Sequence, residues 1–209
     1  MSLLTPMLRS SPLTDWFSDA QRVQGMLDFE AALAQAQAAC GMVPPEAVGP
    51  IVAACRHEAI DFAALGEAAV GAGNLAIPLV KQLTAQVKAR DPEAARYVHW
   101  GATSQDAIDT GLVLQLRGAL DAAETLLEQL LAALALQADR YRDTVMPGRT
   151  WMQHALPVTF GLKLAGTLDA LLRWQQRLRE MRPRLLALQF GGAAGPQARA
   201  AWTLLFPQP

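Results

Sequence analysis

A long stretch of helical periodicity constrains this chain more than any other feature. From Ser104 to about Thr144 there is no proline, and apolar residues recur at three- to four-residue intervals or their multiples. About 40 residues of α-helix span about 60 Å, and a lone helix of that length cannot bury its own apolar stripe. The stretch therefore predicts a long helix that needs partner helices. Its stripe consists of Ile108, Leu112, Leu116, Leu120, Leu127, Leu131 and Leu134.

A second long helix is predicted from about Pro157 to Leu188, with a bend near Pro183. Its arginines predict a solvated basic face. Pro147 and Gly148 end the first long helix and allow the chain to reverse direction. We therefore expect the two long helices to pack antiparallel, with their axes about 8–10 Å apart. Valine and isoleucine are scattered through alanine- and leucine-rich stretches, so no β-sheet is expected.

The first half of the chain predicts shorter helices beneath this pair. After an irregular arm over residues 1–18, we expect helices over Asp19–Cys40, Pro45–Ala54, Asp61–Ala69 and Pro78–Arg90. The fold class is therefore all-α. The predicted domains are a small helical N-terminal domain over residues 1–95 and part of a long-helix bundle over residues 96–195.

Composition excludes several classes of function. The net charge of −1 gives no reason to expect nucleic acid or a charged membrane surface as partner. No apolar run reaches about 18 residues, and the N-terminus lacks the pattern of a secretory signal. We expect a cytoplasmic protein whose cysteines, Cys40 and Cys55, are reduced thiols, although the sequence leaves a disulfide possible. The sequence contains no ligand set for zinc and no glycine-rich phosphate loop.

One polar cluster stands at the start of the first long helix. Thr103-Ser104-Gln105-Asp106 fits a capping-box-like pattern, which explains one hydroxyl and the aspartate. It leaves His99, Gly101 and the second hydroxyl unexplained. Hydroxyls and first-turn N–H groups at a helix N-terminus also suit a carboxylate ligand. Simple capping and anion binding both remain open for this cluster.

The other polar cluster is Gly148-Arg149-Thr150-Trp151-Met152-Gln153-His154. Thr150 and Gln153 again fit a capping box, and Arg149 offers a forked donor matched to a carboxylate. On a helix, Trp151 and His154 would share a face, where His154 is either a structural residue or part of a site.

Two further features have simpler explanations. His57 does not belong to a polar cluster like those around His99 and His154, and it is interpreted as a surface residue. Gly191 to Gly195 is either a flexible linker or helix stop, or a tight turn where backbone meets substrate.

Together these segments resemble the fumarase/aspartase superfamily, and within it a bacterial cycloisomerase branch. The resemblance covers Ser11 to about Gly195 and is specific as a set. Its strongest segments are Leu27–Ala34, Gly73–Val80, Gly101–Thr110, Gly148–Pro157 and Leu188–Ala193.

The resemblance implies an all-α subunit of a homotetramer, with active sites assembled from three subunits and with no cofactor. It implies lactonisation of a small tricarboxylate substrate. Carried over to this sequence, the catalytic residues are His154, as proton donor, and His99. The substrate-binding residues are Thr103, Ser104, Gln105, Arg149, Thr150 and Gln153.

Two departures from the family pattern affect this expectation. Many superfamily lyases carry a catalytic histidine directly after the Arg-Thr pair, where this chain has Trp151, and this favours the cycloisomerase branch over adenylosuccinate or argininosuccinate lyase. The family's mobile Gly-Ser-Ser loop does not occur, and residues 196–209 do not resemble the family's continuation. The chain as given is therefore expected to be inactive. The alternatives are a non-catalytic helical oligomerisation fragment or another lyase of the superfamily.

Overall fold

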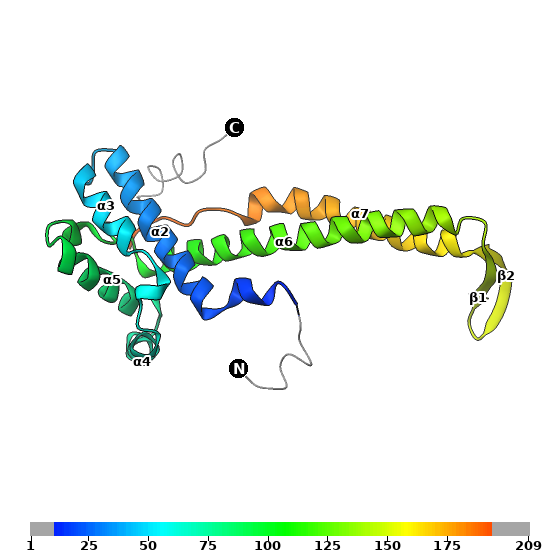
Figure 1. Cartoon of the computed structure of the whole chain (residues 1–209), viewed down its shortest axis with the longest axis horizontal. Helices are drawn as coiled ribbons and strands as arrows, with labels where there is room; N and C mark the ends of the chain where they lie inside the picture. Colours follow the sequence, from blue (N-terminus) through cyan, green and yellow to red (C-terminus); the bar gives the residue numbers. More distant parts are fainter. Residues whose placement is uncertain (1–10, 194–209) are drawn as a thin grey trace. The chain divides into compact units, whose positions relative to one another are not determined.

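The computed structural model describes residues 11–193, which form six α-helices, three short 3-10 helices and one two-stranded sheet (Figure 1). The α-helices are α2 (Asp19–Ala39), α3 (Pro45–Ala54), α4 (Phe62–Ala72), α5 (Ala76–Arg90), α6 (Ser104–Arg140) and α7 (Phe160–Leu185). The 3-10 helices are η1 (Thr14–Phe17), η2 (His57–Ala59) and η3 (Ala94–Tyr97), and the strands are β1 (Val145–Thr150) and β2 (Gln153–Thr159). The predicted all-α class is confirmed. The tail over residues 196–209 lies outside the described residues.

The helix boundaries follow from local capping. The Ser18 hydroxyl accepts from the N–H of Gln21 at 3.3 Å and starts α2, and Asp61 caps α4 through the N–H of Ala64 at 3.0 Å. Helix α4 extends three residues past its predicted end at Ala69, because the left-handed cap is Gly73, with φ of 72°. No helix in the described chain has the length and hydropathy needed to cross a membrane.

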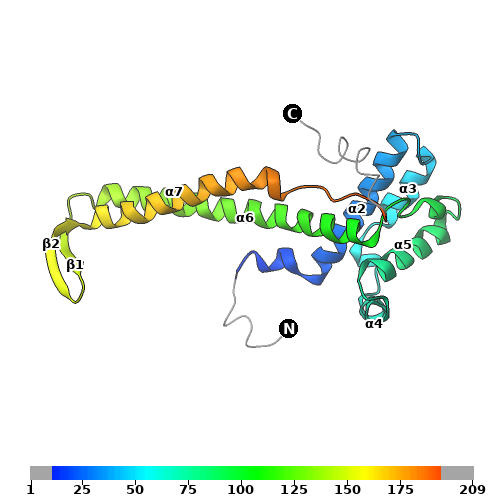
Figure 2. The same ribbon diagram turned by 180° about the vertical axis from the view of Figure 1, so that it is seen from behind.

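Two compact units divide the described residues, one formed by residues 11–118 with 186–193 and the other by residues 119–185. In the first unit, α2, α3 and α5 surround one apolar core (Figure 2). Its most buried large side chains include Phe29 and Leu33 from α2, Ile51 from α3 and Leu83 from α5, each at most 1% exposed. This core fixes α2, the helix that holds the candidate site.

Helices α2 and α6 meet at a pair of glycines. A Cβ atom on Gly25 would lie 2.6 Å from the carbonyl oxygen of Gly111, and one on Gly111 would lie 2.9 Å from the backbone nitrogen of Met26. Real Cβ atoms do not approach backbone so closely, so both positions need hydrogen in place of a side chain. The glycine pair lets the two backbones touch within the first unit.

In the second unit, α7 runs antiparallel to the C-terminal part of α6. Arg179 forms ion pairs with Glu124 and Glu128 at 2.9 and 3.2 Å, and Arg182 pairs with Asp121 and Glu124. The basic residues of α7 are therefore only partly the solvated face that the sequence predicted, because two of them contact acidic residues of α6. Helix α7 begins at Phe160, where the Thr159 hydroxyl caps the N–H of Leu162 at 3.1 Å.

The expectation of no β-sheet is wrong. Strands β1 and β2 form an antiparallel hairpin between the two long helices, in the segment where the second helix was predicted to begin. The sequence did not predict this hairpin because each strand contains a proline, a residue that argues against a strand. In the structure, Pro147 of β1 lies opposite Pro157 of β2. A two-stranded ribbon has two edges, and edge positions are where a strand tolerates proline.

The glycine contact generates a first prediction, on stability. Gly25→Ala should lower the free energy of unfolding by about 1–3 kcal/mol, because overpacking forces the backbones of α2 and α6 apart. The measurement is chemical unfolding followed by circular dichroism. The matched control is Gly66→Ala, an exposed helical position where a Cβ atom would meet nothing within 4 Å, which should be stabilised by up to about 1 kcal/mol. Equal stability of the Gly25 variant and the parent would contradict the close contact.

The two thiols generate a second prediction, on reactivity. Both cysteines are free, with Cys40 exposed and Cys55 buried. Burial raises the pKa of Cys55 to about 12, and the negative charges of Glu30 and Asp28 act on it in the same direction. Since the thiolate is the reactive form, Ellman's reagent at pH 8 should modify Cys40 rapidly and Cys55 only after unfolding. Two thiols reacting at one rate in the folded protein would rule this out.

Candidate functional site

A buried ion pair anchors the first candidate residue. His99 follows η3, and its Nδ1 lies 2.5 Å from Oε1 of Glu30 on α2. The side chain of Glu30 is 2% exposed and that of His99 is 17% exposed. The backbone of His99 has a φ of 58°, in the left-handed region that few residues other than glycine adopt. The pair therefore holds His99 in a conformation that its own backbone does not favour.

The charges around His99 favour its protonated form. Burial lowers the pKa of the imidazole, but the hydrogen bond to Glu30 and the negative charges of Glu30 and Asp106 outweigh it. The pKa of His99 consequently lies above its ordinary value. Within the first unit, His99 is a candidate cation close to the start of α6.

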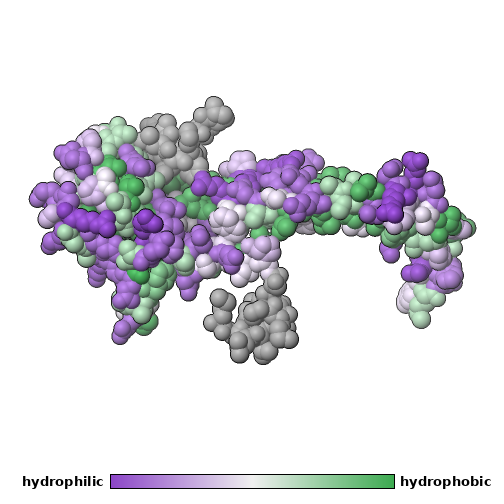
Figure 3. Space-filling model, in the orientation of Figure 1, coloured by the Kyte–Doolittle hydropathy of each residue, from purple (hydrophilic) through white to green (hydrophobic). Residues whose placement is uncertain are grey.

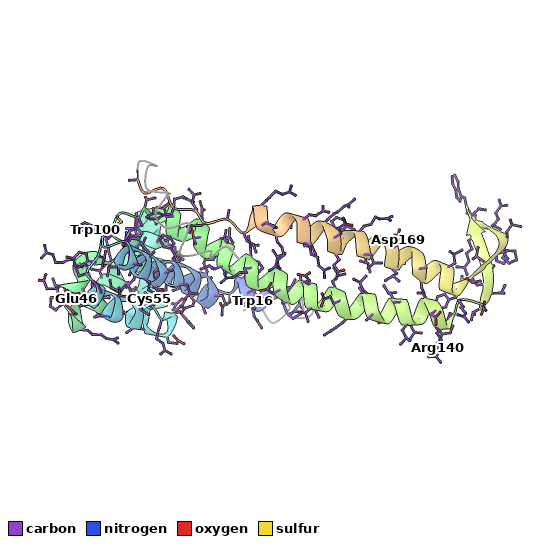
Figure 4. All side chains as sticks on the ribbon, turned by 90° about the horizontal axis from the view of Figure 1, so that it is seen from above. Trp16, Glu46, Cys55, Trp100, Arg140 and Asp169 are labelled. Atoms are coloured by element: carbon purple, nitrogen blue, oxygen red, sulfur yellow. The ribbon has the colours of Figure 1, made fainter. Side chains whose placement is uncertain are left out.

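A second side chain of α2 holds the same loop. The amide nitrogen of Gln37 donates to the carbonyl oxygen of Trp100 at 2.6 Å, two helical turns from Glu30. Trp100, labelled in Figure 4, lies in the turn before α6. The centroid of its ring is 5.8 Å from that of Tyr97. Oε2 of Glu30 and Oε1 of Gln37 are buried, and neither has a hydrogen-bond partner among the described residues. Helix α2 thus fixes the loop before α6 at two successive residues.

Asp106 joins the start of α6 to a segment far along the chain. Its carboxylate is 1% exposed and accepts the N–H groups of Thr103, Gly191 and Gly192, each at 3.0 Å. The bond from Thr103 is the acidic half of the capping box that the sequence predicted. The bonds from the two glycines were not predicted. They correct the idea that this glycine turn offers its N–H groups to substrate, because those of Gly191 and Gly192 bind Asp106.

The other candidates at this helix end differ in what they already contact. Within residues 11–193, the hydroxyls of Thr103 and Ser104 have no hydrogen-bond partner, so they are free to donate to a ligand. Gln105 is exposed, and its amide donates to Asp109 at 2.7 Å along the helix surface. Because Asp106 already supplies a negative charge to the first turn, the hydroxyls and His99 are the groups left for an anion.

A cavity of about 260 Å³ opens farther along α6, and none of the predicted site residues lines it. Its polar lining comes from Arg22, Asn74 and Gln115, and Met26 and Leu112 are among its apolar residues. Asn74 belongs to the family-like segment Gly73–Val80, and its side chain caps α5 by accepting the N–H of Ile77 at 3.0 Å. The cavity is a second place where the first unit offers a cation and amides to a ligand.

The second polar cluster lies on the hairpin and not on a helix. Arg149 pairs with His154 and Thr150 pairs with Gln153, so Trp151 and Met152 form the turn between the strands. The interpretation of Thr150 and Gln153 as a capping box, and of Trp151 and His154 as sharing a helix face, is therefore wrong. Directly opposed residues share a face of the ribbon, which brings Arg149 and His154 together.

Residues 149–154 of the hairpin are exposed, including Trp151 and Met152 at the tip of the hairpin. The four candidate site residues among them are Arg149, Thr150, Gln153 and His154. Met152 has a φ of 60°, the left-handed conformation that this short turn requires. The strands shift register between Pro147 and Arg149, and a Cβ atom on Gly148 would lie 2.4 Å from the carbonyl oxygen of Leu156. The glycine is therefore needed for the bulge that sets which side chains pair near the tip.

The described residues offer no metal centre, since no three or more His, Cys, Asp or Glu side chains in residues 11–193 are grouped to hold an ion. The candidate donors are instead an arginine, histidines and hydroxyls, which are typical of carboxylate recognition.

Comparisons with known proteins agree on one family. A family model described as lyase matches residues 8–201. The 3-carboxy-cis,cis-muconate cycloisomerase of Pseudomonas aeruginosa is 63% identical over 90% of this chain and 41% of its own length.

Two solved structures are also similar. The crystal structure of 3-carboxy-cis,cis-muconate lactonizing enzyme from Pseudomonas putida has a TM-score of 0.90 and 55% identity over 97% of this chain and 46% of that one. That of β-carboxy-cis,cis-muconate cycloisomerase from Acinetobacter calcoaceticus has a TM-score of 0.92 and 44% identity over 98% of this chain and 50% of that one. The chain spans about two fifths of the length of the curated relatives, at 41% to 44%.

The Asp106 contacts generate a third prediction. Asp106→Asn keeps the shape of the side chain but replaces one accepting oxygen with a donor, so at least one buried N–H loses its partner. We expect the free energy of unfolding to fall by about 1–3 kcal/mol. The control is Asp109→Asn on the surface of the same helix, which should change stability by less than about 0.5 kcal/mol. Urea unfolding measures both, and a neutral Asp106 variant would contradict the buried anchoring role.

Proposed function

The chain belongs to the lyase family, in the fumarase/aspartase superfamily, and on that premise we propose that it is the N-terminal part of a cycloisomerase. The proposed reaction is the lactonisation of 3-carboxy-cis,cis-muconate to γ-carboxymuconolactone, a step in protocatechuate breakdown in the cytoplasm. The observation that carries the proposal is the 63% identity, over 90% of this chain, to a relative named for this substrate.

The candidate donors suit a substrate with three carboxylates. His99 and the hydroxyls of Thr103 and Ser104 offer one set of donors at the start of α6. Arg149 and His154, opposed on the hairpin, offer another, and an arginine matches a carboxylate in a forked, charge-assisted pair. We assign Gln105, Thr150 and Gln153 to the same task of binding substrate.

The chemistry needs charge stabilisation and one proton. One substrate carboxylate attacks the conjugated alkene, so that a C–O bond forms and the π-electron pair moves to the neighbouring carbon, beside a carboxylate. That carbon then takes up a proton from the donor, which regains one from solvent, so that the lactone is an isomer of the substrate acid. We propose His154 as the proton donor, because an imidazole side chain can act as a general acid at neutral pH. Cationic His99 and Arg149 would stabilise the negative charge that develops.

Assembly into a homotetramer is part of the proposal. The second unit carries exposed hydrophobic residues on α6, α7 and the hairpin, including Leu136, Leu162, Trp174, Trp151 and Leu156 (Figure 3). Exposed apolar side chains of this kind support burial against other subunits. The site would take one segment from each of three subunits, and the third segment does not occur in residues 1–195. We therefore expect the chain by itself to be inactive.

The fourth prediction tests this proposal with a hybrid enzyme. Residues 1–195 of this chain would be followed by the remaining C-terminal part of the Pseudomonas aeruginosa relative. The hybrid should turn over 3-carboxymuconate at a rate close to that of the relative, and the chain alone should not, as measured by loss of the substrate's ultraviolet absorbance. Activity of the chain alone near that of the hybrid would refute the three-segment site. A folded, tetrameric and inactive hybrid would favour a non-catalytic helical fragment.

Substitutions in the hybrid separate the proposed roles. His154→Ala should lower kcat by about 100-fold or more, the scale of general acid catalysis. Arg149→Ala should mainly raise KM, since a substrate carboxylate loses its charged partner. The matched controls are His57→Ala and Arg142→Ala, which remove a histidine and an exposed arginine outside the proposed site and should leave both constants within about twofold.

A further inference from the structure

The interaction between His99 and Glu30 has a consequence for the chemistry of the ring. Nδ1 lies 2.5 Å from Oε1 of Glu30, and at 2% exposure this carboxylate is shielded from water. A carboxylate only accepts hydrogen bonds, so the proton of this contact resides on Nδ1. The other ring nitrogen, Nε2, is then the one left for a ligand.

We infer that Glu30 is a positioning residue that presents His99 to a substrate carboxylate as a charged Nε2–H donor rather than as a base. The inference rests on the proposed function in its assignment of His99 to the substrate. Glu30 itself lies behind the histidine on α2 and acts through it. No role of its own was assigned to Glu30 from the sequence, although it lies within Leu27–Ala34, one of the segments that carry the family resemblance.

The groups around the ring support a cation at this position. Glu30 faces His99 from α2, and Asp106 adds a negative charge from the first turn of α6. The thiol of Cys55, at the end of α3, also lies close enough to Glu30 to be affected by its charge, and burial keeps it in the neutral form. No described positive side chain pairs with Glu30, so His99 is its counter-charge.

The second oxygen of Glu30 strengthens this conclusion. Oε2 is buried and has no hydrogen-bond partner in the described chain, so the carboxylate is only half satisfied by protein donors. Burying a carboxylate destabilises the folded state unless a positive charge or hydrogen-bond donors pair with it. Here protonated His99 supplies the positive charge, at Oε1. Loss of the proton from His99 would leave a buried charge uncompensated, which resists deprotonation of the ring.

The first test observes the ring directly and needs no turnover. In the ¹⁵N-labelled chain, His99 should keep its proton on Nδ1 when neutral and should titrate above the ordinary midpoint near 6.5. Glu30→Gln should lower the midpoint, because the charge is lost while burial remains. The matched control is Asp28→Asn, an exposed carboxylate on the same helix that bonds Gln24, which should leave the midpoint in place. A wild-type ring protonated on Nε2 alone overturns the inference even if the variant does not fold.

The second test uses the hybrid enzyme across pH. Between the midpoints of the two rings, where the variant ring is neutral and the wild-type ring is charged, Glu30→Gln should raise KM about tenfold. This is the ratio expected when a charge-assisted hydrogen bond becomes a neutral one. The difference should shrink once the pH falls below the midpoint of the variant ring found in the first test, because both rings are then protonated. A KM defect that is equal at all pH values would indicate a structural role only and would overturn the inference. An inactive parent hybrid would instead refute the proposed function, while the ring titration would still decide the state of His99.

Discussion

The buried carboxylate of Asp106 is the interaction on which the arrangement of the first unit depends. It accepts a hydrogen bond from the N–H of Thr103, three residues earlier. It also accepts hydrogen bonds from Gly191 and Gly192, which lie 85 and 86 residues away in the sequence, and all three bonds are 3.0 Å long. One turn later, the Thr110 hydroxyl donates to the carbonyl oxygen of Gln189 at 2.9 Å and accepts from its N–H at 3.2 Å. The segment that follows α7 is thereby fixed along the start of α6. Phe190 then packs beside Phe29 of α2, with ring centroids 6.3 Å apart.

Helix α2 is the second organising element, and it combines two kinds of contact. Gly25 permits backbone contact with α6, whereas Glu30 and Gln37 hold the loop that precedes α6. The candidate residues His99, Thr103 and Ser104 thus lie on a loop and helix end fixed from both sides by buried polar groups. A site that must orient several carboxylates benefits from such rigidity, because binding then orders few protein groups.

The candidate residues of the hairpin are positioned by strand pairing and not by buried polar groups. Arg149, Thr150, Gln153 and His154 are exposed, and the local geometry comes from the register shift at Gly148 and from the turn at Trp151 and Met152. Strand pairing sets which of these side chains lie opposite each other. Side chains presented in this way are suited to complete a site on another subunit, which accords with the proposed tetramer.

The sequence by itself determined the helices and the residues of interest. A 3.6-residue apolar period and local caps are short-range properties, so α2, α3 and α6 begin where predicted, and the polar clusters at His99 and Arg149 stand out by composition. The family, too, was readable from short segments. Only the tertiary structure decided the partners of buried charges. Glu30 and His99 are 69 residues apart, and the glycines that bind Asp106 lie still farther along the chain. The hairpin was also decided by strand pairing, because its prolines hide the alternation by which a strand is recognised. Periodicity reports the environment of each residue along one element, whereas a hydrogen bond between distant segments depends on how the elements pack.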